Sequence, residues 1–475
     1  MRINKCLVLI IGLIGLMTSM LSGCGESDRY TDDGKLVIQY WEKWTGFEYD
    51  AMKAVVDKYN ESQDKVFVEM LPVSQLDSKL LLATAGGNPP DVSGLWSYLV
   101  KTFSEKGALT PLDKAMAKRG ISTDDYIPVL IDLCQHRGFT WGLPATPATI
   151  ALHWNKKLFR ESGLDPNMAP QSLEELDAMS DALTIVRIER EGKDVEVRFT
   201  DLTDTEKEAK NFDLVRVGHL PHVPGWFNTM WVYWFDGDLL EGDRKILADS
   251  PENLAALAWY RSYTEKLGVK NVQQFAAGFG NFASPQDAFL SGKVAMVIQG
   301  VWMHNFIEKY APSMEWAAAP FPSVNPKKTP FVTIAECDTL VVPKGAKHPE
   351  EAFDFIAFVQ KQENMELLCM GQKKFSPLKK VSDDFVSSHP NPYIQTFIDG
   401  AWSKDAKTVP KSPIWKEYTS EMGVGYEQVL SLRKTPEDAA KSVQERIQRK
   451  LDGMVRRWDA VKTERLEQWA NDDTF

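Results

Sequence analysis

The hydrophobic and polar positions along this chain predict an alternation of strands and helices. Residues 36–41 and 66–70 are short, nearly continuous apolar stretches with the length and composition of buried strands. Between them Met52 and Val55 belong to a run of apolar side chains at helical spacing, and residues 76–85 predict a further amphipathic helix. Because strands that alternate with helices are typical of βαβ units, the pattern predicts an α/β fold with mainly parallel sheets.

The apolar run at residues 7–20 has a different character, because it stands near the N-terminus directly after Arg2 and Lys5. A basic start, a short apolar run and small residues before a break form the layout of an export signal. The run is also shorter than the ~20 apolar residues of a typical membrane-spanning helix. We therefore expect residues 1–23 to direct export and to be removed.

A cysteine, Cys24, stands directly after the sequence Leu-Ser-Gly at the end of this segment. The arrangement resembles the lipobox of bacterial lipoproteins, which implies cleavage before Cys24 and attachment of a diacylglycerol to its sulfur. Residues 24–34 would then be a lipidated cysteine and a short polar tether on the extracytoplasmic face of the cell membrane. The alternative is an ordinary secretory signal in which the position of the cysteine is a coincidence.

Composition narrows the possible partners and cofactors. The net charge of −11 argues against nucleic acid and against an anionic membrane surface as the main partner. The later cysteines, Cys134, Cys337 and Cys369, are widely spaced and form no Cys-x-x-Cys pair, so we expect buried thiols rather than a disulfide framework or a zinc site. The sequence contains no dinucleotide fingerprint, phosphate-binding loop or Gly-x-Ser-x-Gly motif, and we expect neither a cofactor nor a metal.

Tryptophan is unusually abundant, with 15 residues, and its distribution is uneven. An indole ring is flat and apolar with one N–H donor, which suits the C–H face of a sugar ring. The simpler interpretation of any single tryptophan is a place in the hydrophobic core. The tryptophans that stand out by position or by clustering are Trp41, Trp44, Trp96, Trp226, Trp231, Trp234 and Trp302.

A series of motifs runs through most of the chain. They lie at residues 86–92, 107–113, 140–144, 151–159, 170–176, 288–302 and 340–352. Among them are Gly-Gly-Asn-Pro-Pro-Asp-Val, Gly-Ala-Leu-Thr-Pro-Leu-Asp, and Phe-Leu-Ser-Gly-Lys-Val-Ala-Met followed by Gly-Val-Trp. In content and order they resemble the motifs of extracellular solute-binding protein family 1, whose members serve sugar ABC importers. The chain departs from the family pattern at residues 335–338, where the family has a Gly-rich step.

A charged insertion at residues 187–210 is a second departure from the family pattern. Its apolar positions alternate on both sides of a Glu-Gly-Lys-Asp sequence, which predicts an exposed hairpin. We expect this hairpin to be a decoration of its lobe. A lid over the ligand and a contact with the permease are the alternatives.

The family resemblance implies the two-lobe fold of the periplasmic binding proteins. Each α/β lobe would be a mainly parallel sheet flanked by helices, with the ligand in a cleft between the lobes and a hinge of crossing strands. Because the chain crosses more than once, each lobe would be discontinuous: residues 35–144 with 325–365 in lobe 1, and 145–324 with 366–475 in lobe 2. The crossings would lie near residues 143–144, within residues 321–330 and beyond residue 360.

Position in this fold singles out candidate ligand contacts. Trp41 and Trp44 follow the first strand, and open α/β sheets bind ligands at the C-terminal ends of strands. Trp302, in the Gly-x-Trp motif, would stack on a sugar ring. Glu336 and Asp338 could accept paired hydrogen bonds from sugar hydroxyls, with a solvated loop as the alternative. The candidate set is Trp302, Trp41, Trp44, Trp96, Trp231, Trp234, Asp91 and Glu336.

Three members of this set, Trp231, Trp234 and Asp91, have specific alternatives. The cluster around Trp231 and Trp234 would supply at least one more surface for a sugar ring, and the alternative is a helix packed in the second lobe. Asp91 has a counterpart in the family, but it could equally cap the turn that follows it.

These expectations describe a monomeric, non-catalytic, lipid-anchored receptor outside the cytoplasm. It would capture a carbohydrate by closing its lobes and deliver it to the membrane permease of an ABC importer, and the number of tryptophans favours an oligosaccharide. One alternative is a secreted glycoside hydrolase, because such clefts also combine tryptophans with carboxylates. Others are a receptor for a polyamine, metal chelate or peptide, and a receptor that presents its ligand to a membrane sensor.

Overall fold

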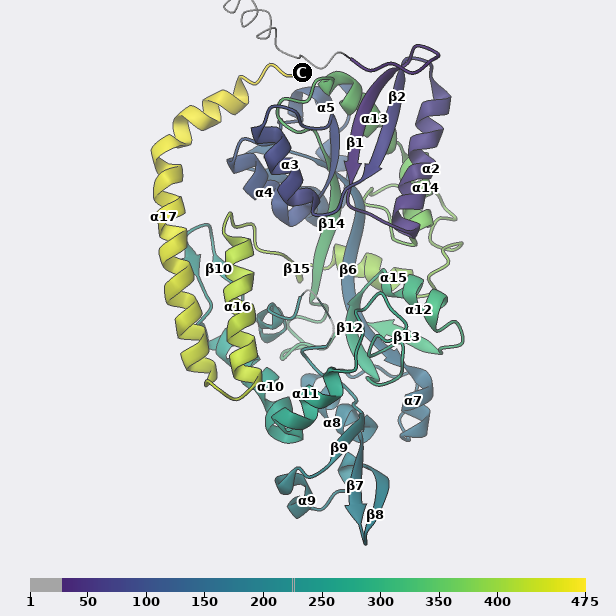
Figure 1. Ribbon diagram of the computed structural model, residues 1–475, viewed down its shortest axis with the longest axis vertical. Coiled ribbons are helices and arrows are strands. Elements are labelled where there is room, and N and C mark those ends of the chain that lie inside the picture. Colours follow the sequence, from purple (N-terminus) through teal and green to yellow (C-terminus); the bar gives the residue numbers. More distant parts are fainter. Residues whose placement is uncertain (1–27, 224, 226) are drawn as a thin grey trace, which may run out of the picture.

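Two long strands shared by both halves of the molecule organise the fold. The computed structural model describes residues 28–223, 225 and 227–475, so Cys24 and Trp226 lie outside the described residues. Strands β6 (Leu143–Asn155) and β14 (Thr333–Val341) pair antiparallel within one 8-stranded sheet. Figure 1 shows both strands passing from the upper half of the molecule into the lower half. The two halves are therefore lobes joined by crossing strands.

The first lobe is built on the parallel strands at the start of the chain. Strand β1 (Leu36–Glu42) pairs parallel with both β2 (Val66–Pro72) and β3 (Val92–Trp96), and β3 pairs antiparallel with β14. The buried side chains of β1 and β2 share a core with those of helix α2 (Phe47–Ser62). Further helices of this lobe are α3 (Leu76–Ala85), α4 (Ser97–Glu105), α5 (Asp113–Arg119), α6 (Pro128–Leu133), α13 (Pro349–Val359) and α14 (Gln362–Gln372).

In the second lobe the strands beside β6 run against it. Strands β12 (Met296–Gly300) and β13 (Trp316–Ala319) both pair antiparallel with β6, because β6 leads away from the first lobe and they lead back. The parallel pairing expected of both lobes is thus found among β1, β2 and β3, while the second lobe is antiparallel around β6. Helical elements of this lobe are α7 (Lys156–Glu161), α8 (Leu173–Leu183), η3 (Trp231–Phe235), α10 (Pro251–Leu267), α11 (Val269–Ala276), α12 (Met303–Tyr310) and α16 (Trp415–Leu430).

The charged insertion forms a small sheet at the far end of the second lobe. Strands β7 (Ile185–Arg190) and β8 (Lys193–Arg198) pair as the predicted hairpin, with β9 (Asp213–Arg216) on the other side of β7. Glu191 and Gly192 occupy the turn with φ angles of 55° and 73°, as a tight two-residue hairpin turn requires. Figure 1 shows this sheet, together with α9 (Asp204–Ala209) between β8 and β9, at the end farthest from the first lobe. It is therefore not a lid between the lobes.

Several short elements complete the described part of the chain. Helix α15 (Ile394–Trp402) packs against β6, and β15 (Ala406–Thr408) pairs parallel with β14. The predicted buried thiols Cys134, Cys337 and Cys369 are confirmed. Among the described residues, no helix combines the length and apolar character needed to cross a membrane. Other short strands are β4 (Gln135–His136), β5 (Phe139–Thr140), β10 (Leu240–Glu241) and β11 (Lys245–Ile246).

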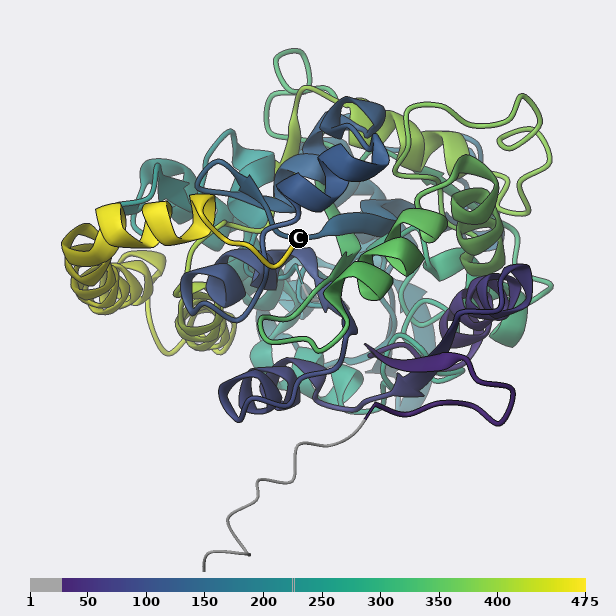
Figure 2. The same ribbon diagram turned by 90° about the horizontal axis from the view of Figure 1, so that it is seen from above.

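The C-terminal helix α17 (Pro436–Ala470), 35 residues long, contacts both lobes. Its Leu451 packs into the second-lobe core, whereas its Trp469 packs against Trp141 of the first lobe. Figure 1 shows α17 along one side of both lobes, and Figure 2 places it at the opposite edge from α2. The prediction that residues 366–475 belong to lobe 2 is therefore wrong for α14 and for the end of α17, because their apolar faces pack on the first lobe.

Candidate functional site

The C-terminal ends of β1 and β3 meet the crossing strand β14 at one point of the sheet. Trp96 ends β3 and is paired with Asp338 of β14, and Trp41 of β1 is paired with Ser93 of β3. The side chains of Trp41, Trp96 and Asp338 are partly exposed, although most residues around them are buried. Ligands of α/β proteins bind at such strand ends. This region is therefore the candidate binding site.

Two buried lysines and three carboxylates form a charged network at this point. Nζ of Lys43 lies 2.9 Å from Oδ1 of Asp338 and 3.2 Å from Oε1 of Glu42. Nζ of Lys374 lies 2.8 Å from Oε1 of Glu48 and 3.6 Å from Oδ2 of Asp338. Each lysine side chain is only 4% exposed. Moving one of these groups away from its partners would leave a buried charge uncompensated, which is energetically costly. The ion pairs therefore hold the five side chains in one arrangement.

The network also sets the charges of its members. Burial raises the pKa of Asp338, but the nearby Lys43 and Lys374 outweigh that effect and hold the pKa below its usual range. Burial lowers the pKa of both lysines, and the adjacent carboxylates outweigh it, so both values are raised. Asp338 is therefore ionised at neutral pH and both lysines are protonated.

Aromatic rings lie against this network. The rings of Trp96 and Tyr98 are stacked, with centroids 6.1 Å apart and an interplanar angle of 14°. Nζ of Lys43 lies 5.3 Å from the centroid of Trp96 and 4.7 Å from that of Trp44. Trp44 is only 5% exposed and belongs to the first-lobe core, so the prediction that it contacts a ligand is wrong, and its ring supports Lys43 instead. The partly exposed Trp96–Tyr98 pair is the aromatic surface that suits the apolar face of a sugar ring.

Glu336 lies beside this network, in strand β14 and not in the loop that its sequence context suggested. It is paired with Ala148 of β6 and faces the same side as Asp338, two positions along the strand. Its Oε1 is buried and has no hydrogen-bond partner among the described residues. Burial and repulsion from Asp338 raise the pKa of Glu336 to about 8, against an opposing effect of Lys43 and Lys374. The carboxyl group is therefore largely protonated at neutral pH.

Trp302 lies in the second lobe, directly after β12. Its indole N–H donates to Oε1 of Gln299 at 3.2 Å. The ring folds over Gly300, where a Cβ would lie 2.3 Å from the indole, so the Gly-x-Trp motif needs its glycine for this packing. The ring is partly exposed beside Phe282, whose side chain is 37% exposed. Trp302 therefore stays a candidate contact contributed by the second lobe.

Two of the candidate tryptophans belong to the core. Trp231 and Trp234, in η3, are 1% and 0% exposed. The ring of Trp231 lies 5.0 Å from that of Trp259 and 5.3 Å from that of Phe321. The prediction that Trp231 or Trp234 stacks on a sugar is wrong, because other side chains cover both rings. The alternative, a helix packed in the second lobe, is confirmed.

Asp91 has a structural role instead of a ligand-binding one. Its Oδ2 accepts a hydrogen bond from the backbone N–H of Gln39 at 2.9 Å, and its Oδ1 accepts one from the backbone N–H of His348 at 3.0 Å. The residue is 7% exposed. Both oxygens are thus used to tie the start of β3 to β1 and to the segment before α13, and the predicted ligand contact is wrong.

Sequence reasoning missed Lys43 and Lys374 as members of this site. Lys43 carried a usable signal, because it lies within two residues of a tryptophan at a strand end. Lys374 carried none. It follows α14, and it reaches the site because α14 packs on α2, where Glu48 is its partner.

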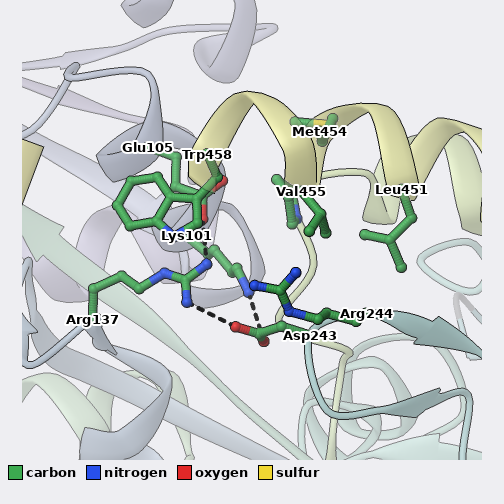
Figure 3. Close-up of a pocket in the computed structure, with 10 residues that line it drawn as sticks. Lys101, Glu105, Arg137, Asp243, Arg244, Leu451, Met454, Val455 and Trp458 are labelled. Atoms are coloured by element: carbon green, nitrogen blue, oxygen red, sulfur yellow. Dashed lines mark hydrogen bonds and ion pairs between the residues drawn. The ribbon is translucent and has the colours of Figure 1, made fainter. Parts of the chain in front are cut away.

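A second charged contact joins the lobes beside α17 (Figure 3). Asp243, between β10 and β11 of the second lobe, lies 3.2 Å from Nζ of Lys101 and 2.9 Å from Nη1 of Arg137, both in the first lobe. The Lys101 side chain is 6% exposed and that of Asp243 is 47% exposed. The Arg137 guanidinium also lies 4.5 Å from the ring centroid of Trp458 on α17. Asp243 thus fixes the lobes to each other in this arrangement.

Replacing Asp243 by asparagine is expected to lower the free energy of unfolding by about 1–2 kcal/mol, because the Lys101 ammonium stays buried with less compensation. The loss is smaller than for a fully buried ion pair because Asp243 is half exposed. Denaturant unfolding measures it. Asp459→Asn, which removes a partner of the exposed Arg244, is the matched control and should cause no measurable change. Equal stability of the Asp243→Asn variant and the unchanged chain would contradict this role.

Sequence comparison places the chain among binding proteins. The family described as bacterial extracellular solute-binding protein matches residues 54–395. A putative binding protein of Brucella abortus is 24% identical over 416 residues, which cover 85% of this chain and 89% of that protein. The arabinooligosaccharide-binding protein of Bacillus subtilis is 22% identical over 385 residues, which cover 79% of this chain and 81% of that protein.

Solved structures share the fold. The structure of CpMnBP1 with mannobiose bound has a TM-score of 0.72 at 25% identity, covering 86% of this chain and 98% of that one. The sugar-binding protein MalE from Xanthomonas citri has a TM-score of 0.69 at 20% identity, covering 89% of this chain and 98% of that one. The similarity extends over nearly the whole of both chains, and the predicted two-lobe α/β architecture is confirmed.

Proposed function

Since this chain belongs to the bacterial extracellular solute-binding protein family, we propose that it captures a carbohydrate between its lobes and delivers it to the permease of an ABC importer. The observation that carries this proposal is the Trp96–Tyr98 pair at the edge of the charged network. The stacked rings would cover the apolar face of a sugar, while Lys43 and Asp338 would exchange hydrogen bonds with its hydroxyls. Closure around the ligand would be a hinge movement about β6 and β14.

An oligosaccharide is the preferred ligand class. Partly exposed tryptophans lie on both lobes, Trp41 and Trp96 on the first and Trp302 on the second, so more than one sugar ring could be stacked. The names of similar proteins agree with this class: the Bacillus subtilis relative is an arabinooligosaccharide-binding protein, and CpMnBP1 was solved with mannobiose and with mannotriose.

The proposal includes export and a lipid anchor at Cys24. Its support is the sequence pattern: a basic start, a short apolar run, and a cysteine after Leu-Ser-Gly. Residues 1–23 would be removed, and residues 24–34 would tether a monomeric receptor to the outer side of the cell membrane. An anchored receptor stays close to the permease that it supplies.

One feature of the site bears on glycoside hydrolysis, the main alternative. Glu336 and Asp338 are neighbouring carboxyl groups whose pKa values are shifted in opposite directions, as in acid–base pairs. However, Asp338 is ion-paired with both Lys43 and Lys374, which engages the oxygens that a nucleophile or base would need. The site is therefore better suited to binding than to cleavage.

The proposal is tested by titrating the chain with mono- and oligosaccharides while tryptophan fluorescence and thermal unfolding are recorded. A carbohydrate receptor should give a saturable fluorescence change, and ligand at 100 times its Kd should add about 2.7 kcal/mol of stability. The sugar should be recovered unchanged. Release of shorter sugars would support a hydrolase instead. A response only to polyamines or peptides would overturn the ligand class.

A further inference from the structure

Glu336 differs from the other charged side chains of the site because, in the part of the chain that the structure describes, its carboxyl group forms no ion pair. Its Oε1 is buried without a hydrogen-bond partner among the described residues. The register of β14 places it opposite Ala148 of β6, and its carboxyl group lies close enough to Tyr98 of α4 to raise the pKa of that phenol. Since β14 crosses between the lobes, this carboxyl group lies where the proposed ligand would bind.

The cations near Glu336 are already used by other carboxylates. Lys43 and Lys374 each contact Asp338, and each also contacts one further glutamate. These two lysines and three carboxylates already carry more negative than positive charge. An additional negative charge on Glu336 would lie in a largely buried place and would be repelled by Asp338.

The charged and titratable groups that face Glu336 come from several elements. Asp338 lies on its own strand, Lys43 follows β1, and Lys374 follows α14. Tyr98 lies on α4, and the charge of Asp77 on α3 also acts on Tyr98. None of these groups supplies a free cation, so ionisation of Glu336 would have to be compensated by a ligand.

We propose that Glu336 determines ligand specificity as a neutral carboxylic acid that donates a hydrogen bond to an oxygen of the ligand. The inference rests on the proposed function and adds the chemistry of one contact. A protonated carboxyl group can donate, whereas a carboxylate can only accept. The contact therefore favours a hydroxyl or ring oxygen of a neutral carbohydrate. A ligand that presented an ammonium group would need the ionised form, because an ammonium has no acceptor.

This contact makes the affinity for the ligand depend on pH in the range around and above pH 8. Burial and Asp338 raise the pKa of Glu336 to about 8. The pKa of Asp338 is lowered and those of Lys43, Lys374 and Tyr98 are raised, so these groups keep their charge between about pH 6 and pH 9. Affinity should therefore be constant well below pH 8. It should fall by about tenfold per pH unit above it, because the proton must be present for binding.

The test measures the affinity of the full chain between about pH 6 and pH 9.5 for the tightest ligand among mannobiose, mannotriose and an arabinooligosaccharide. Glu336→Gln keeps a donor at this position, so it should stay within about threefold of the unchanged chain at pH 7 and lose the pH dependence. Glu336→Ala should bind at least about tenfold more weakly. Glu464→Gln, on an exposed position of α17, is the matched control and should behave like the unchanged chain.

A ligand-free measurement tests the protonation directly. The fluorescence of the unchanged chain should show a transition near pH 8, because Trp96 is paired with Asp338, two positions from Glu336, and Glu336→Gln should lack it. If the chain bound sugar but showed no such transition, the role of Glu336 would be overturned and the proposed carbohydrate binding would stand. An affinity that stayed constant or rose with pH would have the same meaning. A Glu336→Gln variant as weak as Glu336→Ala would also overturn this role. Failure of the chain to bind any sugar of the panel would overturn the proposed function and this contact with it.

Discussion

Replacement of Trp96 by alanine is expected to weaken carbohydrate binding by roughly 30-fold, equivalent to about 2 kcal/mol. The ring is partly exposed, stacks on Tyr98 and is held from one side by Lys43. Its loss removes the main apolar surface of the site while the charged network keeps its own ion pairs. Isothermal titration calorimetry with the sugar identified by fluorescence measures the change.

Two variants make this result specific to the ring. Trp96→Phe keeps a flat apolar face and should lose less affinity than Trp96→Ala. Trp402→Ala removes a tryptophan that is 50% exposed at the end of α15, and it should bind as tightly as the unchanged chain. If a correctly folded Trp96→Ala variant bound sugar with unchanged affinity, the ligand would have to lie elsewhere.

Replacement of Trp231 by alanine should instead act on stability, lowering the free energy of unfolding by about 3–5 kcal/mol. The side chain is 1% exposed and packs against Trp234, Trp259 and Phe321, so its removal leaves a cavity in the second-lobe core. Denaturant unfolding measures the loss. The folded fraction should bind sugar with nearly unchanged affinity, because the ring has no open face.

The exposed Trp402 again provides the control, since its replacement by alanine should change the stability little. A Trp231→Ala variant that was as stable as the unchanged chain but no longer bound sugar would restore Trp231 as a ligand contact. Together the Trp96 and Trp231 variants separate a binding role of tryptophan in this chain from a packing role.

Much of the fold could be predicted from the sequence. Strands β1 and β2 and helix α3 begin at the predicted residues, and the β7–β8 hairpin forms around its predicted turn. These elements depend on side chains within a few positions of each other, and the spacing of the apolar residues indicates directly whether such a stretch is a helix or a strand. Pairing directions in the second lobe could not be read in the same way, because the period of a strand is the same whether its neighbour is parallel or antiparallel.

The candidate site was only partly predictable, for a related reason. Trp96 and Trp231 have the same side chain and similar local surroundings, yet one is partly exposed at a strand end and the other lies in the core. Burial depends on which distant surfaces meet, and a local pattern contains no record of that. Lys374 illustrates the point most clearly, since it joins Glu48 and Asp338 only because separate elements pack together.

By itself, the sequence determined the local elements, the order of the family motifs and hence the two-lobe α/β architecture, because all of these are written in short stretches of chain. The tertiary structure alone decided which tryptophans are open to a ligand, that Asp91 binds backbone N–H groups, and that Oε1 of Glu336 has no hydrogen-bond partner among the described residues. These properties arise from contacts between residues far apart in the chain, where exposure and charge are set by neighbours that only folding brings together.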